Sequence, residues 1–218
     1  MNKRKIINNT ARYSREKLSG ESSGHDWWHT QRVWKTAVCI GKREKADMFV
    51  IELAALLHDI ADFKFHKGNT LIGAETAKQW LTKQGVDKTT ADKVCEIVKN
   101  VSFKGAGVKS KIKTKEGMVV QDADRLDAMG AIGIGRVFAF GGARGKEMYN
   151  PKIKPKLHKT FGEYKNSKGT TINHFYEKLL LLKDLMNTKT GKVMAKSRHE
   201  FMKQFLERFF REWKGTED

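Results

Sequence analysis

Proline is scarce in this chain of 218 residues, which has only Pro151 and Pro155, both in one segment. Because proline breaks helices, its near absence leaves most of the chain free to form long helices. Strand-like alternation of apolar and polar residues is almost absent as well, and a helical period dominates. The sequence therefore predicts an all-α fold, and the lack of a visible repeat or low-complexity linker predicts a single domain over residues 1–218.

Cysteine is equally scarce: Cys39 and Cys95 both lie in helical patterns, and neither has a CxxC partner. This usage is typical of reduced core residues rather than of a disulfide framework. No apolar run approaches the roughly 18 to 20 residues that span a bilayer, and the N-terminal sequence lacks the apolar centre of a signal peptide. We therefore expect a cytoplasmic protein with no membrane partner, either a monomer or a homodimer.

Acidic residues are outnumbered, since 25 Asp and Glu face 43 Lys and Arg and leave a net charge of +18. The excess is concentrated in two glycine-containing stretches, residues 104–115 and 144–168. A field of this sign attracts polyanions, so a nucleic acid and a small phosphorylated substrate are both compatible partners. The alternative is a solubilising lysine coat, and charge alone does not choose between them.

Helical periodicity and start signals divide the chain into nine predicted helices. Asp47, Asp87 and the pair Asn69–Thr70 are typical N-terminal capping residues. The last two helices carry apolar residues at helical spacing, which favours a C-terminal helical hairpin packed on its own domain over a membrane-lying helix. A basic loop, 141–170, precedes this hairpin. The predicted ranges are 2–19, 25–44, 46–60, 69–84, 87–101, 114–129, 131–140, 171–187 and 190–213.

Polar residues interrupt three of these apolar helices. His29 falls in WWHTQRV, His58 and Asp59 fall in LLHDIAD, and the segment QDADRLDAMG contains Asp122, Asp124 and Asp127. Carboxylates and imidazoles in a dry core are costly unless they are paired. Arginines, here Arg32 and Arg125, relieve part of that cost, and a divalent cation relieves more.

The donor types indicate which cation would fit. Imidazole nitrogen combined with carboxylate oxygen suits Mn²⁺, Fe²⁺, Co²⁺, Ni²⁺ and Zn²⁺, and a site without thiolates leaves coordination positions open for water or substrate. Adjacent residues on a helix point about 100° apart. Joint ligation by His58 and Asp59 therefore predicts that the pair lies at a helix end.

In this order and context the segments WWHTQRV, ALLHDIAD and QDADRLDAMGAIG resemble the H…HD…D pattern of the HD-domain superfamily of metal-dependent phosphohydrolases, over about residues 20–140. The resemblance implies one divalent ion, with Mn²⁺ favoured and Mg²⁺ also compatible. Asp124 is preferred to Asp122 because it precedes Arg125 in D-R-x-D. Asp127 and Arg125 would surround the ligands, and the dipeptide His25–Asp26 is interpreted as a decoy. The implied ligands are His29, His58, Asp59 and Asp124.

The resemblance also implies attack of metal-bound water on a phosphate or pyrophosphate bond. Asp62, four residues after His58, is predicted to be a general base or to position water, and His66 to protonate a leaving oxygen or hold phosphate. Each has a simpler alternative, as a solvated aspartate or an exposed histidine. Basic side chains would bind phosphate oxygens. The candidates are Lys64, Arg32, Lys104, Arg144 and Lys146.

The substrate is less well defined by the sequence. A single H…HD…D set favours a mononuclear site, and the basic loops suit a nucleoside triphosphate slightly better than a monophosphate. A nucleic-acid-binding protein or phosphodiesterase is the main alternative, with lysines of residues 104–115 and the pair Trp27–Trp28 as contacts. The helical pattern around His29 instead favours core packing of both tryptophans. An inactive HD scaffold is the third interpretation.

Overall fold

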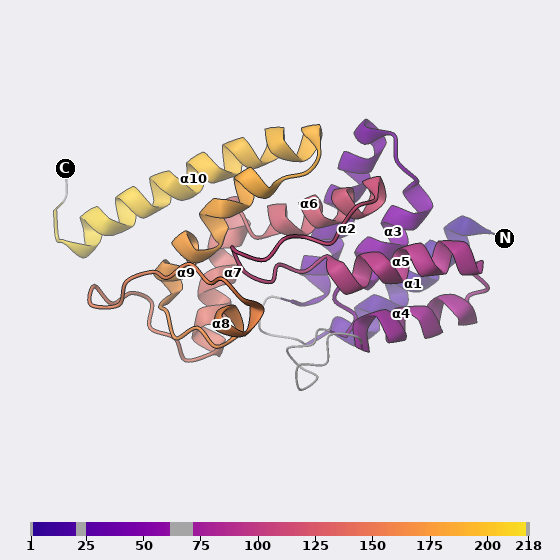
Figure 1. The fold of residues 1–218 in the computed structure, drawn as a ribbon, viewed down its shortest axis with the longest axis horizontal. Helices are drawn as coiled ribbons and strands as arrows, with labels where there is room; N and C mark the ends of the chain where they lie inside the picture. Colours follow the sequence, from indigo (N-terminus) through magenta and orange to yellow (C-terminus); the bar gives the residue numbers. More distant parts are fainter. Residues whose placement is uncertain (1, 21–24, 62–71, 217–218) are drawn as a thin grey trace. The chain divides into compact units, whose positions relative to one another are not determined.

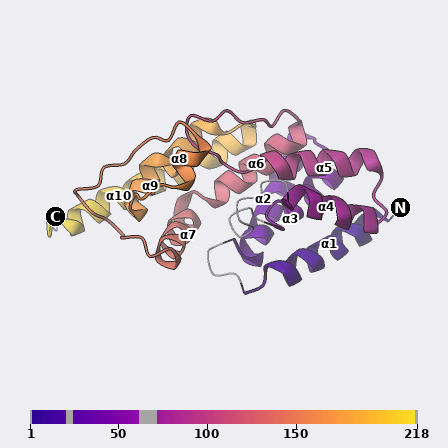
Figure 2. The same ribbon diagram turned by 60° about the horizontal axis from the view of Figure 1, so that its bottom comes forward.

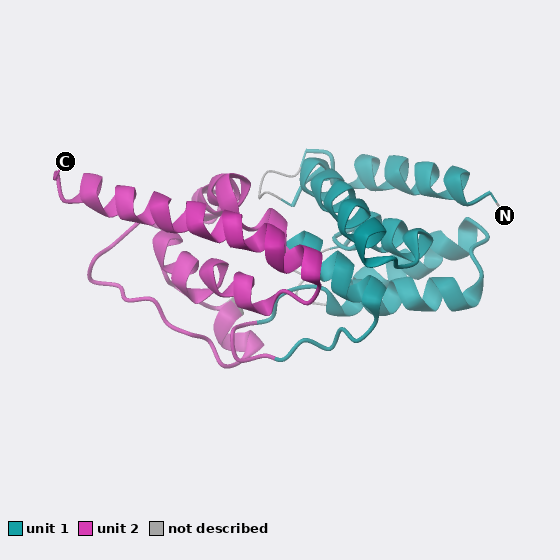
Figure 3. Cartoon of the chain, turned by 90° about the horizontal axis from the view of Figure 1, so that it is seen from above, with its two compact units in different colours: residues 1–104, 109–124 teal, residues 105–108, 125–218 magenta. Residues whose placement is uncertain are grey.

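The computed structural model describes residues 2–20, 25–61 and 72–216 (Figure 1). All regular structure in these ranges is helical, which confirms the predicted all-α class. The chain divides into two compact units, the first made of residues 1–104 and 109–124 and the second of residues 105–108 and 125–218 (Figure 3). That the whole chain acts as one domain stays a prediction.

The first unit is built around α3 (Met48–Leu57), which packs against α1, α2 and α5. Almost every residue of α3 is buried, because the run MFVIELAALL is apolar on all sides. Helices α4 and α5 lie side by side, as Figures 1 and 2 show. The other helices of this unit are α1 (Lys3–Leu18), α2 (Trp27–Glu44), α4 (Ile72–Lys83), α5 (Lys88–Asn100) and the part of α6 (Lys115–Asp127) that ends at Asp124.

Two of the predicted start signals are confirmed. The Asp47 carboxylate accepts hydrogen bonds from the N–H groups of Phe49 and Val50 at the start of α3, and Asp87 accepts one from Thr90 at the start of α5. These bonds satisfy backbone donors that a helix start leaves without partners. The third signal, Asn69–Thr70, lies outside the described residues.

The second unit contains α7 (Gly130–Ala143), α8 (Phe161–Lys165), α9 (Thr171–Glu177), a 3₁₀ helix η1 (Leu179–Leu185) and α10 (Lys189–Trp213). Helix α10 packs on α7 and η1, and α9 packs on α7. The core of the unit includes Phe175, Leu182 and Met202, all fully buried. The predicted C-terminal hairpin is therefore formed by α9 and η1 with α10.

Two boundaries differ from the prediction. The single helix expected over 171–187 breaks at Lys178 (φ −143°, ψ −61°), and the chain continues as η1. A 3₁₀ helix has three residues per turn, so Leu179 and Leu182 fall on one line, and both are buried. The expected loop 141–170 is also shorter, because α7 extends to Ala143 and the loop contains α8.

Among the described residues, no single helix has the length and apolar character needed to cross a membrane. The bent pair α6 and α7 meets that criterion jointly, by length and composition only.

Candidate metal centre

The start of α2 places His29 in the core. The Asp26 carboxylate caps this helix by accepting a hydrogen bond from the His29 N–H at 2.8 Å, and the His29 side chain is fully buried. Trp27 is also buried, whereas Trp28 is 57% exposed. Core packing is thus confirmed for Trp27 and wrong for Trp28, because adjacent residues on a helix point about 100° apart and only Trp27 turns inward.

His58 and Asp59 follow the last residue of α3 and lie in a turn, which confirms that the pair lies at a helix end. A helix end leaves carbonyl oxygens without backbone partners. Here the Ala55 carbonyl accepts a hydrogen bond from His58 Nδ1 at 2.8 Å, and the Leu56 carbonyl accepts one from the Ser14 hydroxyl at 2.7 Å. Side chains therefore complete the end of α3 and fix the turn.

The hydrogen bond of His58 also decides its tautomer. A carbonyl oxygen only accepts, so Nδ1 of His58 carries the proton. In a neutral imidazole the lone pair then lies on Nε2, the arrangement found in metal-ligating histidines. This Nε2 lies 3.1 Å from Nε2 of His29, in a region where both side chains are buried.

Substitution Ser14→Ala is expected to lower the free energy of unfolding by about 1–2 kcal/mol, because the buried Leu56 carbonyl loses its donor. Urea unfolding of the metal-free protein measures the effect. Ser19→Ala is the matched control at the end of the same helix, since the Ser19 hydroxyl also donates to a carbonyl, that of Arg15, but is exposed. Equal effects at both positions would contradict the role given to Ser14.

Helix α6 brings a third part of the chain, with Asp124, close to the two histidines. Asp124 Oδ1 lies 3.6 Å from Nε2 of His29 and 3.9 Å from Nε2 of His58. The Asp124 side chain is 25% exposed, whereas Asp122 is fully buried. Two residues apart on a helix means roughly 200° of rotation, so the two carboxylates point to different sides. The aspartate brought to the imidazoles is Asp124.

The Asp59 and Asp124 carboxylates both lie near the two imidazole nitrogens, and we call these side chains the ligand cluster: His29, His58, Asp59 and Asp124. Asp59 Oδ2 lies 3.3 Å from Nε2 of His29 and 3.5 Å from Nε2 of His58. Ligands held at about 2.1 Å from an ion lie about 3.0 Å apart at octahedral angles and about 3.4 Å apart at tetrahedral angles. The separations of 3.1 to 3.9 Å that involve the two imidazole nitrogens are of the size that ligands of a divalent cation have. Two overlapping groups could hold an ion, His29, His58 and Asp124, and His25, His29 and Asp59.

A fifth group, which the sequence did not predict, reaches the cluster. Nδ1 of His25 lies 2.7 Å from Asp59 Oδ2, and its side chain is 19% exposed. The two rings of His25 and His29 meet edge to face with centroids 5.5 Å apart. The dipeptide His25–Asp26 is consequently no decoy: Asp26 caps α2 and His25 contacts a predicted ligand.

The surroundings of Asp59 keep its carboxylate ionised. Burial alone would raise its pKa, but the charges of His58 and His25 and hydrogen bonds from His25 and His29 hold the pKa well below its ordinary value. A carboxylate that stays charged is the form that binds a metal ion. The cluster thus combines an anionic oxygen with His58, whose Nε2 offers a lone pair to an ion when the ring is neutral.

This geometry agrees with what comparison to known proteins finds. The HD domain family model matches residues 27–129, and YpgQ of Bacillus subtilis, an uncharacterized protein, is 42% identical over 201 residues, which are 92% of this chain and 90% of YpgQ. The chain belongs to the HD-domain superfamily. Metal-dependent phosphohydrolysis is the general activity of HD-superfamily hydrolases, and the cluster supplies His and Asp groups able to hold the metal.

Solved structures of similar proteins share the fold over nearly the whole chain. An HD-superfamily hydrolase from Bacillus thuringiensis is 42% identical with a TM-score of 0.74, covering 97% of this chain and 98% of its own. A protein from Lactobacillus plantarum is 37% identical with a TM-score of 0.87, covering 97% and 98%. The Bacillus subtilis YpgQ structure in complex with ADP is 37% identical with a TM-score of 0.74, covering 94% and 97%.

The structure describes only some of the residues that we predict to transfer protons or bind phosphate near the ligand cluster. Asp62, Lys64 and His66 lie outside the described residues, so their roles stay predictions. Arg32 is half-buried on α2, one turn after His29 and therefore on the same side of that helix. Its role in substrate binding also stays a prediction.

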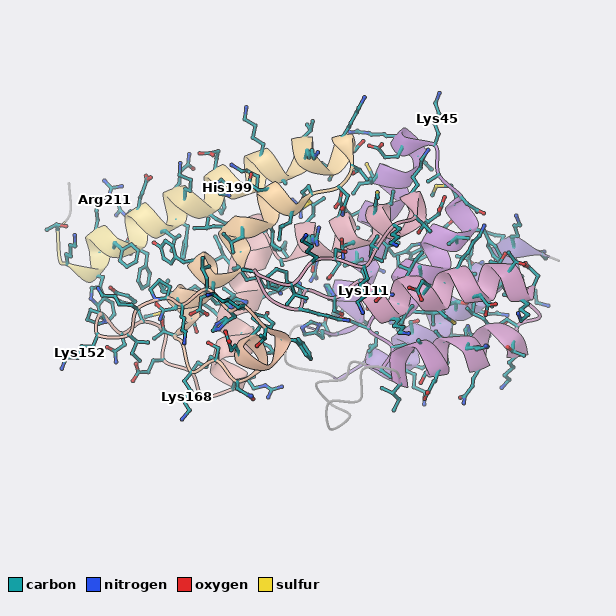
Figure 4. All side chains as sticks on the ribbon, in the orientation of Figure 1. Lys45, Lys111, Lys152, Lys168, His199 and Arg211 are labelled. Carbon is teal, nitrogen blue, oxygen red and sulfur yellow. The ribbon has the colours of Figure 1, made fainter. Side chains whose placement is uncertain are left out.

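Lys104 follows α5 in the same unit as the ligand cluster and is half-buried. Burial lowers its pKa, and the charges of Lys111 and Lys99 lower it further (Lys111 is labelled in Figure 4). Three ammonium groups that repel one another are stabilised by any anion placed among them. Lys104 therefore remains a good candidate for phosphate binding.

Arg144 and Lys146 belong to the second unit and already have partners there. The Arg144 guanidinium lies 5.4 Å from the ring centre of Phe140, and the Lys146 ammonium donates to the Ser167 carbonyl at 3.3 Å. Burial lowers the pKa of Lys146, opposed by the charge of Glu177. Lysines of the same loop are exposed, among them Lys152 and Lys168 (Figure 4). A substrate role for Arg144 and Lys146 stays a prediction.

Arg125 and Asp127 lie in the last turn of α6 and contact neighbouring elements. Asp127 is buried and pairs with Arg136 of α7 at 3.2 Å, while Arg125 donates to the Leu185 carbonyl. Both contacts lie within the second unit and hold α6 to its neighbours. The role predicted for the two residues around the metal ligands stays a prediction.

Proposed function

We propose that this protein hydrolyses a phosphate or pyrophosphate bond of a nucleotide in a reaction that depends on one divalent ion, with Mn²⁺ favoured. The observation that carries the proposal is the ligand cluster, in which two carboxylates from separate segments each lie 3.3 to 3.9 Å from the two imidazole nitrogens. Two carboxylates with two neutral imidazoles bind a divalent ion while leaving positions open for solvent and substrate.

Each member of the cluster has a part that follows from its surroundings. His58 presents Nε2 because its Nδ1–H is bound to a carbonyl, and Asp59 stays ionised at neutral pH. Asp124 is the most exposed of the four, so the accessible side of the cluster lies next to it. A divalent ion held here would polarise a phosphoryl oxygen and lower the pKa of a bound water.

A nucleotide is supported as the substrate by two observations. A relative that is 37% identical to this chain, Bacillus subtilis YpgQ, has been solved in complex with ADP. In this chain Lys104 is half-buried, and its burial and the positive charges of Lys111 and Lys99 lower its pKa. A bound polyphosphate would stabilise its ammonium group. Asp62 and His66 remain our candidates for moving protons at the water and at the leaving oxygen.

The test is a panel of nucleoside mono-, di- and triphosphates with Mn²⁺, Mg²⁺ or Co²⁺, in which phosphate and pyrophosphate are assayed separately. We expect turnover that is highest with Mn²⁺, and release of pyrophosphate from triphosphates. Single-stranded DNA is included as a substrate, because its cleavage would favour the phosphodiesterase alternative. Equal rates for wild-type protein and Asp59→Ala with every compound would refute the proposed function.

A further inference from the structure

His25 lies next to the ligand cluster but is not one of its four members. It directly precedes α2, and its Nδ1 makes the shortest contact in the cluster, 2.7 Å to Asp59 Oδ2. Its side chain is mostly covered, with 19% exposed. A contact this short between an imidazole and a largely buried carboxylate requires a proton between the two atoms.

The direction of that hydrogen bond follows from chemistry. An ionised carboxylate only accepts, so His25 donates its Nδ1–H to Oδ2 of Asp59. The same oxygen faces Nε2 of His29 at 3.3 Å and Nε2 of His58 at 3.5 Å. Oδ2 of Asp59 therefore contacts the His25 donor and also faces the two imidazole nitrogens of the ligand cluster.

The backbone before α2 explains how His25 reaches Asp59. Asp26 is in an extended conformation (φ −83°, ψ 179°), and neighbouring side chains on extended backbone point to opposite sides. Asp26 turns toward the helix, where it accepts from the His29 N–H, and His25 turns the other way. One His-Asp dipeptide thus positions two predicted ligands, His29 through its backbone and Asp59 through its carboxylate.

We propose that His25 is a positioning residue of the metal centre, which holds Oδ2 of Asp59 in the orientation that binds the ion. The inference rests on the proposed function, because it assumes that the cluster binds a divalent metal. Asp59 lies in a turn beyond the end of α3, where no helix fixes its side chain. Without the His25 donor the carboxylate gains rotamers that point away from the ion, and affinity for the metal falls.

The experiment measures binding of Mn²⁺ to metal-stripped protein by isothermal titration calorimetry. His25→Leu removes the donor and keeps similar bulk, and His25→Asn retains an N–H near the position of Nδ1. We expect the Kd for Mn²⁺ to rise about 10- to 100-fold in His25→Leu, the range typical of groups that orient metal ligands. His25→Asn should stay close to wild type.

His199→Leu is the matched control. His199 is a half-buried histidine of α10, labelled in Figure 4, and its Nδ1 has no hydrogen-bond partner among the described residues. Removing it should leave the Kd unchanged. The melting temperature of each metal-free variant is measured alongside, and an unchanged value in His25→Leu separates lost positioning from lost folding.

The outcomes distinguish the two proposals. Wild-type affinity in His25→Leu, or an equal loss in His25→Asn and His25→Leu, overturns the positioning role and leaves the proposed function intact. Wild-type protein that binds no divalent ion overturns both. A weakened Kd in His25→Leu alone, in a protein that hydrolyses no nucleotide, supports the positioning role and refutes the proposed function.

Discussion

Substitution Asp59→Ala should lower nucleotide hydrolysis by about a thousandfold or more. Asp59 contributes the anionic oxygen that faces both imidazoles, and polarisation of the substrate by a bound ion is worth several kcal/mol, of which about 4 kcal/mol corresponds to a thousandfold in rate. Helix content should remain nearly unchanged, because Asp59 lies beyond the end of α3. Steady-state kinetics with Mn²⁺, together with far-ultraviolet circular dichroism, measure both effects.

Asp92→Ala is the control for Asp59→Ala. Asp92 belongs to the same unit, on α5, and its half-exposed carboxylate forms ion pairs with Lys78 and Lys88. Exposed ion pairs contribute little, so this variant should keep wild-type activity. Hydrolysis by Asp59→Ala at the level of Asp92→Ala would mean that the ligand cluster does not carry the reaction.

The second large effect is expected on stability. The ligand cluster has two imidazole nitrogens 3.1 Å apart beside a buried carboxylate, and an ion that binds only the folded state stabilises that state. At a free Mn²⁺ concentration of about 100 times Kd the gain is about 2.7 kcal/mol, which corresponds to a rise in melting temperature of roughly 5–10 °C for a chain of this size. Differential scanning calorimetry with and without Mn²⁺ measures the rise.

The rise in melting temperature that Mn²⁺ produces should become smaller as the pH falls. Metal ligands must be deprotonated, so protons compete with the ion for the ligand atoms. The pKa of Asp59 is held well below its ordinary value, so that carboxylate stays charged, and the decrease is measured between pH 7.5 and about 5.5. Asp59→Ala serves as the control and should show almost no rise at any pH. A rise that persists in Asp59→Ala would place the stabilising ion elsewhere.

Much of the fold follows from local sequence. Apolar periodicity and side chains such as Asp47 and Asp87 define most helix boundaries to within two or three residues, because caps and periodicity act through near neighbours. The break at Lys178 has no such signal, since no glycine or proline interrupts HFYEKLLLLKDLM. There the tertiary packing of Leu179 and Leu182 overrides local helix propensity.

The site, like the fold, can be predicted only in part from the local sequence. The four residues of the ligand cluster were inferred because imidazole and carboxylate groups do not belong in apolar helices without a compensating charge. His25 gave no such signal, because it lies outside every apolar run and its partner is 34 residues away. The available hint was the capping role of Asp26: an N-cap three residues before His29 places the preceding residue at the entrance of α2.

Helices α2 and α6 and the turn after α3 each contribute to the ligand cluster, and Asp124 follows His29 by 95 residues. During synthesis the nascent chain therefore lacks its last ligand until more than half of the protein has left the ribosome. Before that point only a weaker, three-residue set is present. Capture of the ion is thereby tied to completion of the first unit, so that a truncated product arrested before α6 should emerge without a tightly held metal.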